Sequence, residues 1–223
     1  MNVLIAIPAF NEEKNIAKVI EMIRQESPDM DYVVVSDGST DKTANICKEL
    51  DCPVIELPVN LGLGGAFGCA MKYANRKGYD ALIQIDGDAQ HNPNYINDLV
   101  AKMVSTNVDV VIGSRFCEKS APYTTLRGFG SHIITTLIRI KTHKTIHDPT
   151  SGMRVYNNKV IKLFVNNDFM EPEPHTIAFL LKNGFSVEEV PVKMNERLEG
   201  KSYLGGFKAM RYMARVCTSI LLV

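Results

Sequence analysis

The sequence has no excess of charge of either sign: its 223 residues carry 25 basic and 25 acidic side chains. It therefore lacks the positive footprint of a protein that binds nucleic acid. Its cysteines are odd in number and lack the spacing of a metal site; they are Cys47, Cys52, Cys69, Cys117 and Cys217. Because the start of the chain also shows no signal peptide, we expect reduced thiols in the cytosol.

Internal repeats, low-complexity linkers and the Gly-x-x-x-x-Gly-Lys sequence of a P-loop are missing as well. The chain does have 45% hydrophobic residues, enough for one large core. Apolar runs predict strands at 2–7, 32–36, 53–57, 81–85, 109–113 and 186–192. Helical patterns lie near 12–26, 41–50, 63–77, 93–105, 128–140 and 174–183. This alternation predicts an α/β fold with a mostly parallel sheet flanked by helices.

Two aspartates follow the predicted strand at 81–85. Alternate residues of a strand point to one side, so Asp86 and Asp88 can converge at its carboxyl end. Two carboxylates that leave most of a coordination shell open suit Mg²⁺ or Mn²⁺ shared with a diphosphate. The alternative is a plain turn, in which the Asp and Gly residues bind no ligand.

Polar residues also follow the first two predicted strands. The first strand breaks at residues 8–13, and the second ends at Asp37, before a glycine that permits a tight turn. In open parallel sheets, ligands bind outside the carboxyl ends of the strands. The three strand ends therefore predict one polar cleft.

Six motifs occur in a fixed order between residue 3 and about residue 204. They are Ile-Pro-Ala-Phe-Asn-Glu-Glu at 7–13, Val-Ser-Asp-Gly-Ser-Thr-Asp at 35–41, Asn-Leu-Gly-Leu-Gly-Gly at 60–65, Asp-Gly-Asp-Ala-Gln-His at 86–91, Gly-Ser-Arg-Phe at 113–116 and Asp-Pro-Thr-Ser-Gly-Met-Arg at 148–154. With these motifs the sequence resembles glycosyltransferase family 2, the nucleotide-sugar-dependent group that includes dolichyl- and polyprenyl-phosphate sugar synthases. The resemblance implies the GT-A fold, a single Rossmann-like domain in which nucleotide and acceptor share one side.

The resemblance also implies a donor site for a UDP- or GDP-linked sugar. Asp37 would accept a hydrogen bond from the nucleotide base, and Asp88 would bind the metal together with Asp86 and Gln90. The residues implied for donor binding are Pro8, Ala9, Asn11, Glu12, Asp37, Gly62, Asp86, Arg115 and Lys201. Glu12 has an alternative role at a helix N-terminus, where the dipole favours acidic side chains. The alternative to donor binding for Gly62 is a structural role, in which it permits close packing at the start of a helix.

The candidate phosphate-binding residues lie in the middle of the chain. Arg115 ends a predicted strand, and Arg127 precedes Ser131 by one helical turn. The same spacing in dolichyl-phosphate mannose synthases implies that these groups contact phosphates, whose oxygens a guanidinium fork suits. A surface salt bridge is the alternative for the arginines. Lys201, like Arg197, matches a basic loop that closes on the donor diphosphate in relatives.

Glu173 lies between two prolines and resembles the segment that carries the catalytic carboxylate of many inverting relatives. It would be a general base for a hydroxyl acceptor, but would only orient substrate if the acceptor is a lipid phosphate. The usual Glu-Asp pair of the family is absent here, so the base assignment stays open. The predicted catalytic residues are thus Asp88, Glu173 and Arg127.

We divide the chain into a catalytic domain at 1–204 and an amphipathic C-terminal helix at 205–223. Only eight residues follow Arg215, far fewer than the roughly 20 that span a bilayer. Such a basic amphipathic helix can lie in a membrane interface, pack on its own domain, or dock a small membrane protein.

The prediction is a metal-dependent inverting glycosyltransferase that uses Mg²⁺ or Mn²⁺. It would move a hexose or N-acetylhexosamine from a nucleotide diphosphate to polyprenyl (undecaprenyl) phosphate for cell-surface glycan synthesis. We expect it in the cytoplasm, peripheral on the inner face of the cell membrane. One alternative is a transferase that extends a saccharide on a lipid diphosphate. Another is a sugar-nucleotide-binding regulator without turnover.

Overall fold

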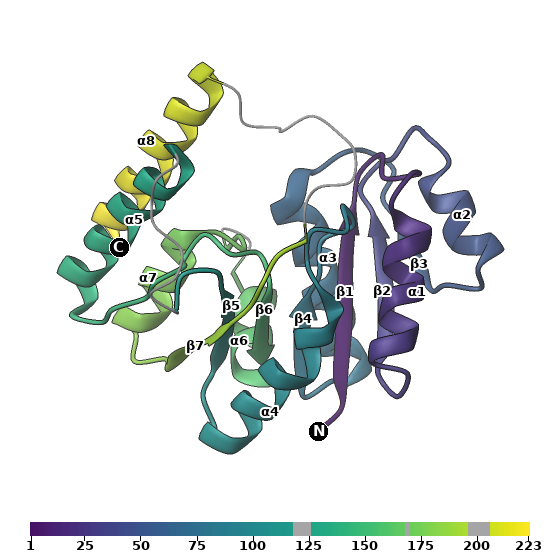
Figure 1. Cartoon of the computed structure of the whole chain (residues 1–223), viewed down its shortest axis with the longest axis horizontal. Helices are drawn as coiled ribbons and strands as arrows, with labels where there is room; N and C mark the ends of the chain where they lie inside the picture. The colour runs from purple at the N-terminus through teal and green to yellow at the C-terminus, as the bar shows by residue number, and fades with distance from the viewer. Residues whose placement is uncertain (118–125, 168–169, 196–205) are drawn as a thin grey trace.

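A computed structural model describes residues 1–117, 126–167, 170–195 and 206–223. Within them, strands and helices alternate along the chain (Figure 1). The strands are β1 Val3–Ala9, β2 Asp31–Ser36, β3 Val54–Glu56, β4 Ala81–Gln84, β5 Val110–Ser114, β6 Arg154–Asn157 and β7 Val187–Pro191. The helices are α1 Ile16–Glu26, α2 Thr43–Glu49, α3 Gly62–Lys77, α4 Ile96–Thr106, α5 Leu126–Thr142, α6 Asn158–Val165, α7 Pro174–Lys182 and α8 Gly206–Leu222, with a 3₁₀ turn at Pro93–Tyr95.

The described strands form one sheet in the order β3-β2-β1-β4-β6-β5-β7. All neighbouring pairs are parallel except the two that involve β6, which runs antiparallel to both β4 and β5. The prediction of a mostly parallel sheet flanked by helices is confirmed. The carboxyl ends of β1, β2 and β4 lie next to one another at one edge of the sheet.

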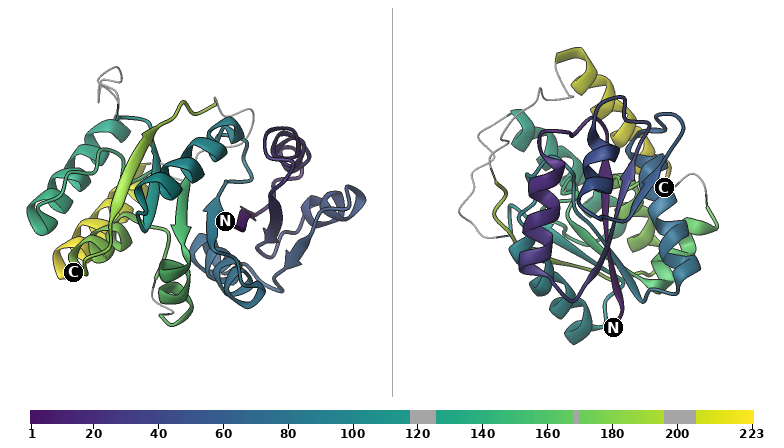
Figure 2. Two further views of the ribbon diagram at one scale, coloured as in Figure 1. Left: turned by 90° about the horizontal axis from the view of Figure 1, so that it is seen from below. Right: turned by 90° about the vertical axis from the view of Figure 1, so that its right-hand side faces the viewer.

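Each face of the sheet has its own apolar core, because successive strand residues point to opposite sides. In β1, Ile5 and Ile7 pack with α1 and α4, whereas Leu4 and Ala6 pack with the helices of the opposite face. Those helices are α3, α5, α6, α7 and α8. Figure 2 shows the sheet between its two helical layers. Both faces are covered, as the continuous apolar runs of the strands require.

The predicted elements are present, and the structure adds two that the sequence did not indicate, β6 and α6. One boundary was wrong by several residues. The first helix begins at Ile16 rather than at residue 12, because residues 12–15 form a turn. The strand before the paired aspartates ends at Gln84, one residue earlier than predicted, and both aspartates follow it.

Helix α8 lies alongside α5 and α7 (Figure 1). It buries Val216 and Ile220 completely in the core that those helices share. The division proposed between residues 204 and 205 lies outside the described residues. None of the described helices is long and apolar enough to cross a bilayer.

Candidate active site

The three predicted strand ends come together in the structure. The backbone N–H of Asp37, after β2, donates to the Ala9 carbonyl at the end of β1, with an N–O distance of 2.8 Å. On the other side, the Gly87 N–H after β4 donates to the Pro8 carbonyl at 3.3 Å. Pro8 and Ala9 therefore occupy the centre of this edge through backbone atoms, between the two aspartate-bearing turns.

Asp37 is buried, and its side chain holds the turn that precedes α3. It is only 3% exposed, and its Oδ1 accepts the Leu61 N–H at 2.8 Å. Gly38 makes this approach possible: it has a φ of +64°, and a Cβ there would lie 2.4 Å from the Asn60 nitrogen. The predicted nucleoside-binding aspartate is thus oriented by the motif at residues 60–65. Gly62, the first residue of α3, has open space around its Cα.

Asn11 and Glu12 join the turn after β1 to the turn after β2. The Asn11 Oδ1 accepts the Thr40 N–H at 2.8 Å, and the Glu12 N–H donates to the Thr43 Oγ1 at 2.8 Å. Asn11 has a φ of +55°, which is tolerated by asparagine better than by most residues. Glu12 also supports the start of α1: its carbonyl accepts the Ile16 N–H at 2.9 Å, and its carboxylate accepts the side-chain amide of the N-cap Asn15 at 2.7 Å.

The turn after β4 exposes the three predicted metal ligands. Asp86, Asp88 and Gln90 are half-buried, whereas the residues between them, Gly87 and Ala89, are buried. The carboxylates and the amide are thus on the solvent side of the turn, although it is not a strand. The Oδ1 of Asp88 accepts the Gln90 N–H at 3.0 Å, which closes the turn.

This donor set is of the hard, oxygen-rich kind that suits Mg²⁺ or Mn²⁺, with other positions left for a diphosphate and water. Among the described residues, no group of three or more His, Cys, Asp or Glu side chains could hold a metal ion.

Arg115 is held by a buried carboxylate. Its Nε and Nη2 donate to the two oxygens of Asp148 at 2.7 and 2.8 Å, and its backbone N–H donates to Asp148 Oδ2 at 3.0 Å. Asp148 is completely buried, whereas the Arg115 side chain is 37% exposed. Burial alone would raise the pKa of Asp148, but hydrogen bonds and the positive charge of Arg115 outweigh it and lower the pKa. Arg115 is therefore rigidly oriented with part of its side chain in solvent.

Ser131 presents a hydroxyl without a partner. It is 3% exposed on α5, and its Oγ has no hydrogen-bond partner among the residues that the structure describes. Such a buried polar atom has an unmet hydrogen-bonding requirement that a ligand can supply. The side chain of Arg127, one turn earlier, lies outside the described residues, as do Arg197 and Lys201.

Glu173 is engaged by the C-terminal helix. Its Oε2 accepts a hydrogen bond from the Tyr212 hydroxyl, and its Oε1 lies 3.7 Å from the Arg215 guanidinium. Burial raises the pKa of Tyr212, as do the charge and hydrogen bond of Glu173. Arg215 also pairs with Glu171 at 3.5 Å, and the Glu171 Cγ would lie 3.0 Å from a Cβ at Gly64, near the start of α3.

Tyr212 and Arg215 were not found from the sequence, which indicated only an amphipathic pattern around them. Arg154 was also missed as a buried group. It is 1% exposed, and it donates to the carbonyls of Pro149 and Ser151, both at 2.7 Å. The sequence indicated a role for Arg154 only through its place as the last residue of the motif at 148–154.

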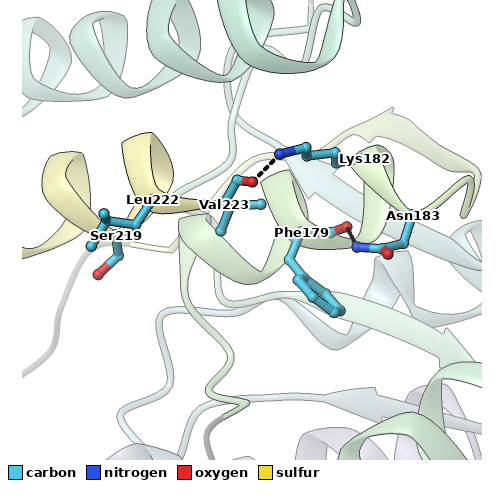
Figure 3. Close-up of a pocket in the computed structure, with 6 residues that line it drawn as sticks. All are labelled: Phe179, Lys182, Asn183, Ser219, Leu222 and Val223. Carbon is cyan, nitrogen blue, oxygen red and sulfur yellow. Dashed lines mark hydrogen bonds between the residues drawn. The ribbon is translucent and has the colours of Figure 1, made fainter.

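A pocket elsewhere contains none of the predicted residues. It lies between the C-terminal parts of α7 and α8 (Figure 3). Its lining is Phe179, Lys182, Asn183, Ser219, Leu222 and Val223. The Lys182 Nζ donates to the Val223 carbonyl across it. Half of these residues are apolar and none has a carboxylate side chain, so the pocket does not match the chemistry of the strand-end site.

The fold and the strand-end site define a class of protein. Residues 4–164 match the family described as Glycosyl transferase family 2. The structure resembles glucosyl-3-phosphoglycerate synthase from Mycobacterium tuberculosis, solved with Mn²⁺, UDP and phosphoglyceric acid, with a TM-score of 0.70 at 16% identity over 99% of this chain and 77% of that one. This likeness supports the GT-A fold.

Curated relatives cover most of the chain as well. Polyprenol monophosphomannose synthase of Mycolicibacterium smegmatis is 29% identical over 96% of this chain and 84% of its own. UDP-N-acetylglucosamine–dolichyl-phosphate N-acetylglucosaminyltransferase of Methanococcus voltae is 28% identical over 86% of this chain and 84% of its own. The chain belongs to glycosyltransferase family 2, and it is a glycosyltransferase.

Proposed function

We propose that the protein transfers a hexose or N-acetylhexosamine from a nucleotide diphosphate to a polyprenyl phosphate, with inversion at the anomeric carbon. The two named relatives act on polyprenol and dolichyl phosphates, according to their names. They differ in the sugar, so the donor is proposed only as a class, linked to UDP or GDP.

The observation that carries the proposal is how Glu173 is held. A general base needs a lone pair directed at the acceptor proton, within hydrogen-bond reach. Both carboxylate oxygens of Glu173 instead face groups of α8, the Tyr212 hydroxyl and the Arg215 guanidinium. A lipid phosphate arrives ionised and needs no base. The arrangement therefore favours a phosphate acceptor, with Glu173 fixing the position of α8 against the site.

The groups suited to hold that phosphate belong to α5. Ser131 has a buried hydroxyl that lacks a hydrogen-bond partner among the described residues. Arg115, which Asp148 orients, is assigned to the donor diphosphate. Arg127 belongs to the same helix as Ser131, and we assign it to the acceptor phosphate. A guanidinium and a hydroxyl fit phosphate oxygens in geometry and charge.

A divalent cation would be held by Asp88 and Asp86, with Gln90 beside them, and Mg²⁺ or Mn²⁺ fits these oxygens. Such an ion neutralises charge on the departing diphosphate. Asp37, oriented by the Leu61 N–H, would accept a hydrogen bond from the nucleotide base. Pro8, Ala9, Asn11 and Glu12 surround that subsite.

We further propose that α5 and α8 rest on a membrane surface on the cytoplasmic side. The two helices lie side by side and expose large apolar side chains. These are Ile133 and Ile140 on α5 and Met210, Leu221 and Leu222 on α8. Arg139 and Arg211, also exposed, flank them. Exposed apolar and basic side chains together are typical of a helix in the interface of an anionic membrane.

The test is to incubate the protein with polyprenyl phosphate and a panel of radiolabelled UDP- and GDP-sugars, and to measure organic-extractable label. We expect one donor to give a mild-acid-labile lipid phosphosugar. Arg127→Ala should lose nearly all activity, whereas the control Arg76→Ala, at an exposed arginine in the last turn of α3, should retain it. Glu173→Gln should be milder, since removal of a true base costs a factor of about 10²–10⁴.

The opposite pattern would contradict the proposal. If Glu173→Gln is inactive, Arg127→Ala is active, and the labelled product is a saccharide on lipid diphosphate, the enzyme extends a chain instead. If nucleotide sugar binds but no acceptor is ever labelled, the protein is a binding regulator.

A further inference from the structure

We infer that His91 is a positioning residue that fixes the Asp86 carboxylate in the orientation needed for the metal–diphosphate subsite. This inference rests on the proposed function, in which Asp86 contacts the metal or the ribose. His91 ends the motif at 86–91, and the sequence indicated only a loop-structuring role for it.

The hydrogen bonds around His91 fix its tautomer. Its Nδ1 accepts the backbone N–H of Asp86 at 2.9 Å, so this nitrogen carries no proton. The ring proton is therefore on Nε2, which lies 3.5 Å from Oδ2 of the same aspartate. His91 thus contacts both the backbone and the side chain of Asp86. Because His91 is only 5% exposed, packing holds the ring in place.

The other oxygen of Asp86 is held as well. Its Oδ1 accepts from the side-chain amide of Gln84, a completely buried residue of β4, at 2.9 Å. Gly152 closes the remaining side: a Cβ there would lie 3.1 Å from both Asp86 Oδ2 and His91 Cε1. Arg154 anchors the segment that contains Gly152 through the carbonyls of Pro149 and Ser151.

This arrangement restricts the Asp86 carboxylate before any substrate arrives. Its rotamer is set by Gln84 on one oxygen and by His91 on the other, while the side chain stays 36% exposed. Second-layer hydrogen bonds of this kind orient metal-binding carboxylates, and their loss typically lowers metal affinity about 10- to 100-fold. If His91 only filled space, an apolar side chain of similar size would serve equally well.

Two substitutions separate these possibilities. His91→Leu retains most of the volume but loses both the hydrogen bond from the Asp86 N–H and the 3.5 Å contact of Nε2 with Oδ2. His91→Asn places an amide oxygen near the position of Nδ1, so it can still accept the Asp86 N–H. His143→Asn is the matched control, because His143 is exposed and outside the site, with a φ of +56° that asparagine tolerates. Circular dichroism and thermal unfolding establish that each variant is folded.

The measurement is calorimetric binding of UDP, and in parallel of GDP, with and without Mn²⁺. In the wild type, Mn²⁺ should tighten binding of one nucleotide. In His91→Leu this enhancement should fall about tenfold or more, while metal-free binding stays unchanged. His91→Asn keeps the acceptor for the Asp86 N–H but has no donor at the position of Nε2, so its enhancement should fall as well. An enhancement within twofold of the wild type in folded His91→Leu or in folded His91→Asn would overturn the inference.

A second measurement does not depend on the metal or on His91→Leu being folded. In ¹⁵N-labelled wild type, the histidine nitrogen shifts should show a proton on Nε2 and an unprotonated Nδ1 for His91. A proton on Nδ1 would refute the hydrogen bond on which the inference rests. Failure of the proposed metal role would appear differently, as an absence of any Mn²⁺ effect in the wild type itself.

Discussion

Replacing Asp148 with asparagine should destabilise the protein strongly, because Asp148 is the buried partner of Arg115. The carboxylate is completely buried, and it accepts from the Arg115 backbone, Nε and Nη2 and from the Thr150 hydroxyl. In Asp148→Asn, the amide oxygen still accepts, but the NH₂ group that replaces the other oxygen faces donors of Arg115 and cannot accept from them. Breaking a buried ion pair costs about 3–5 kcal/mol. Because Arg115 is 37% exposed and water can solvate it, we expect a loss near the lower end, about 3 kcal/mol.

The pH dependence of this loss follows from the lowered pKa of Asp148. A carboxyl group whose pKa is depressed on folding stabilises the protein above its unfolded-state pKa, about 3.9 for aspartate. That stabilisation is lost as the pH falls through the lower folded-state value. The protonated carboxyl then resembles an asparagine, so the difference between wild type and variant should shrink below about pH 4.

Urea unfolding at pH 7 and at several values down to pH 3 measures the free energy of unfolding of both proteins. Asp29→Asn, at an exposed turn residue, is the control and should differ little from the wild type. A loss of less than about 1 kcal/mol at pH 7 would refute the reasoning about the buried pair. So would a difference that persists undiminished at low pH.

Asp88→Ala should abolish transfer with only a small drop in unfolding temperature, because it removes a half-buried carboxylate and its hydrogen bond from the Gln90 N–H but leaves no core cavity. Transfer that survives in the variant, or in excess chelator, would refute the metal assignment. Asp37→Asn should weaken nucleotide binding by about 1.5–3 kcal/mol, the value of a hydrogen bond to a charged group, and unchanged calorimetric affinity would remove Asp37 from the site. Gly38→Ala should destabilise by more than about 1 kcal/mol in urea unfolding, since its Cβ would lie 2.4 Å from the Asn60 nitrogen at a φ of +64°. A neutral result would mean that this turn can move.

The parallel part of the sheet was predictable because its strands are continuous apolar runs that end at polar turns. β1, β2 and β4 were located within a few residues, and their adjacent carboxyl ends brought Asp37 and Asp86 to one edge, as expected. The exposure of Asp86 was also anticipated, although for an incorrect reason. Its orientation comes from the turn after β4 and not from strand alternation.

β6 was not predictable in the same way. It is only four residues long and begins with Arg154, a residue that normally indicates solvent, followed by Val155 and Tyr156. Its place in the sheet depends on pairing with β4 and β5, which are distant in sequence. Local sequence patterns carry no information about such partners. The segment therefore resembles a loop in the sequence, and it is a strand only because of its tertiary pairing.

The contacts of Glu173 with α8 could not be predicted from the sequence, for a related reason. Two prolines correctly indicated a rigid segment, but nothing in the chain near Glu173 indicates that Tyr212 and Arg215 would approach it. That contact exists only because α8 packs between α5 and α7. Roles that depend on one residue can be read from a motif, whereas roles that depend on the packing of distant helices cannot.

The reversal of β6 has a consequence for how this site can change during evolution. Because β6 runs against its neighbours, the segment before it, rather than after it, reaches the edge where Asp37 and Asp86 lie. The nucleotide side is thus built from turns that follow strands, and the side with Asp148 and Gly152 from a turn that precedes one. The two sides of the site are therefore attached to different strands of the same sheet. We expect that exchanges in the segment before β6 change how Arg115 and Asp86 are held, while the turns after β1 and β2 keep the nucleoside subsite around Asp37 unchanged.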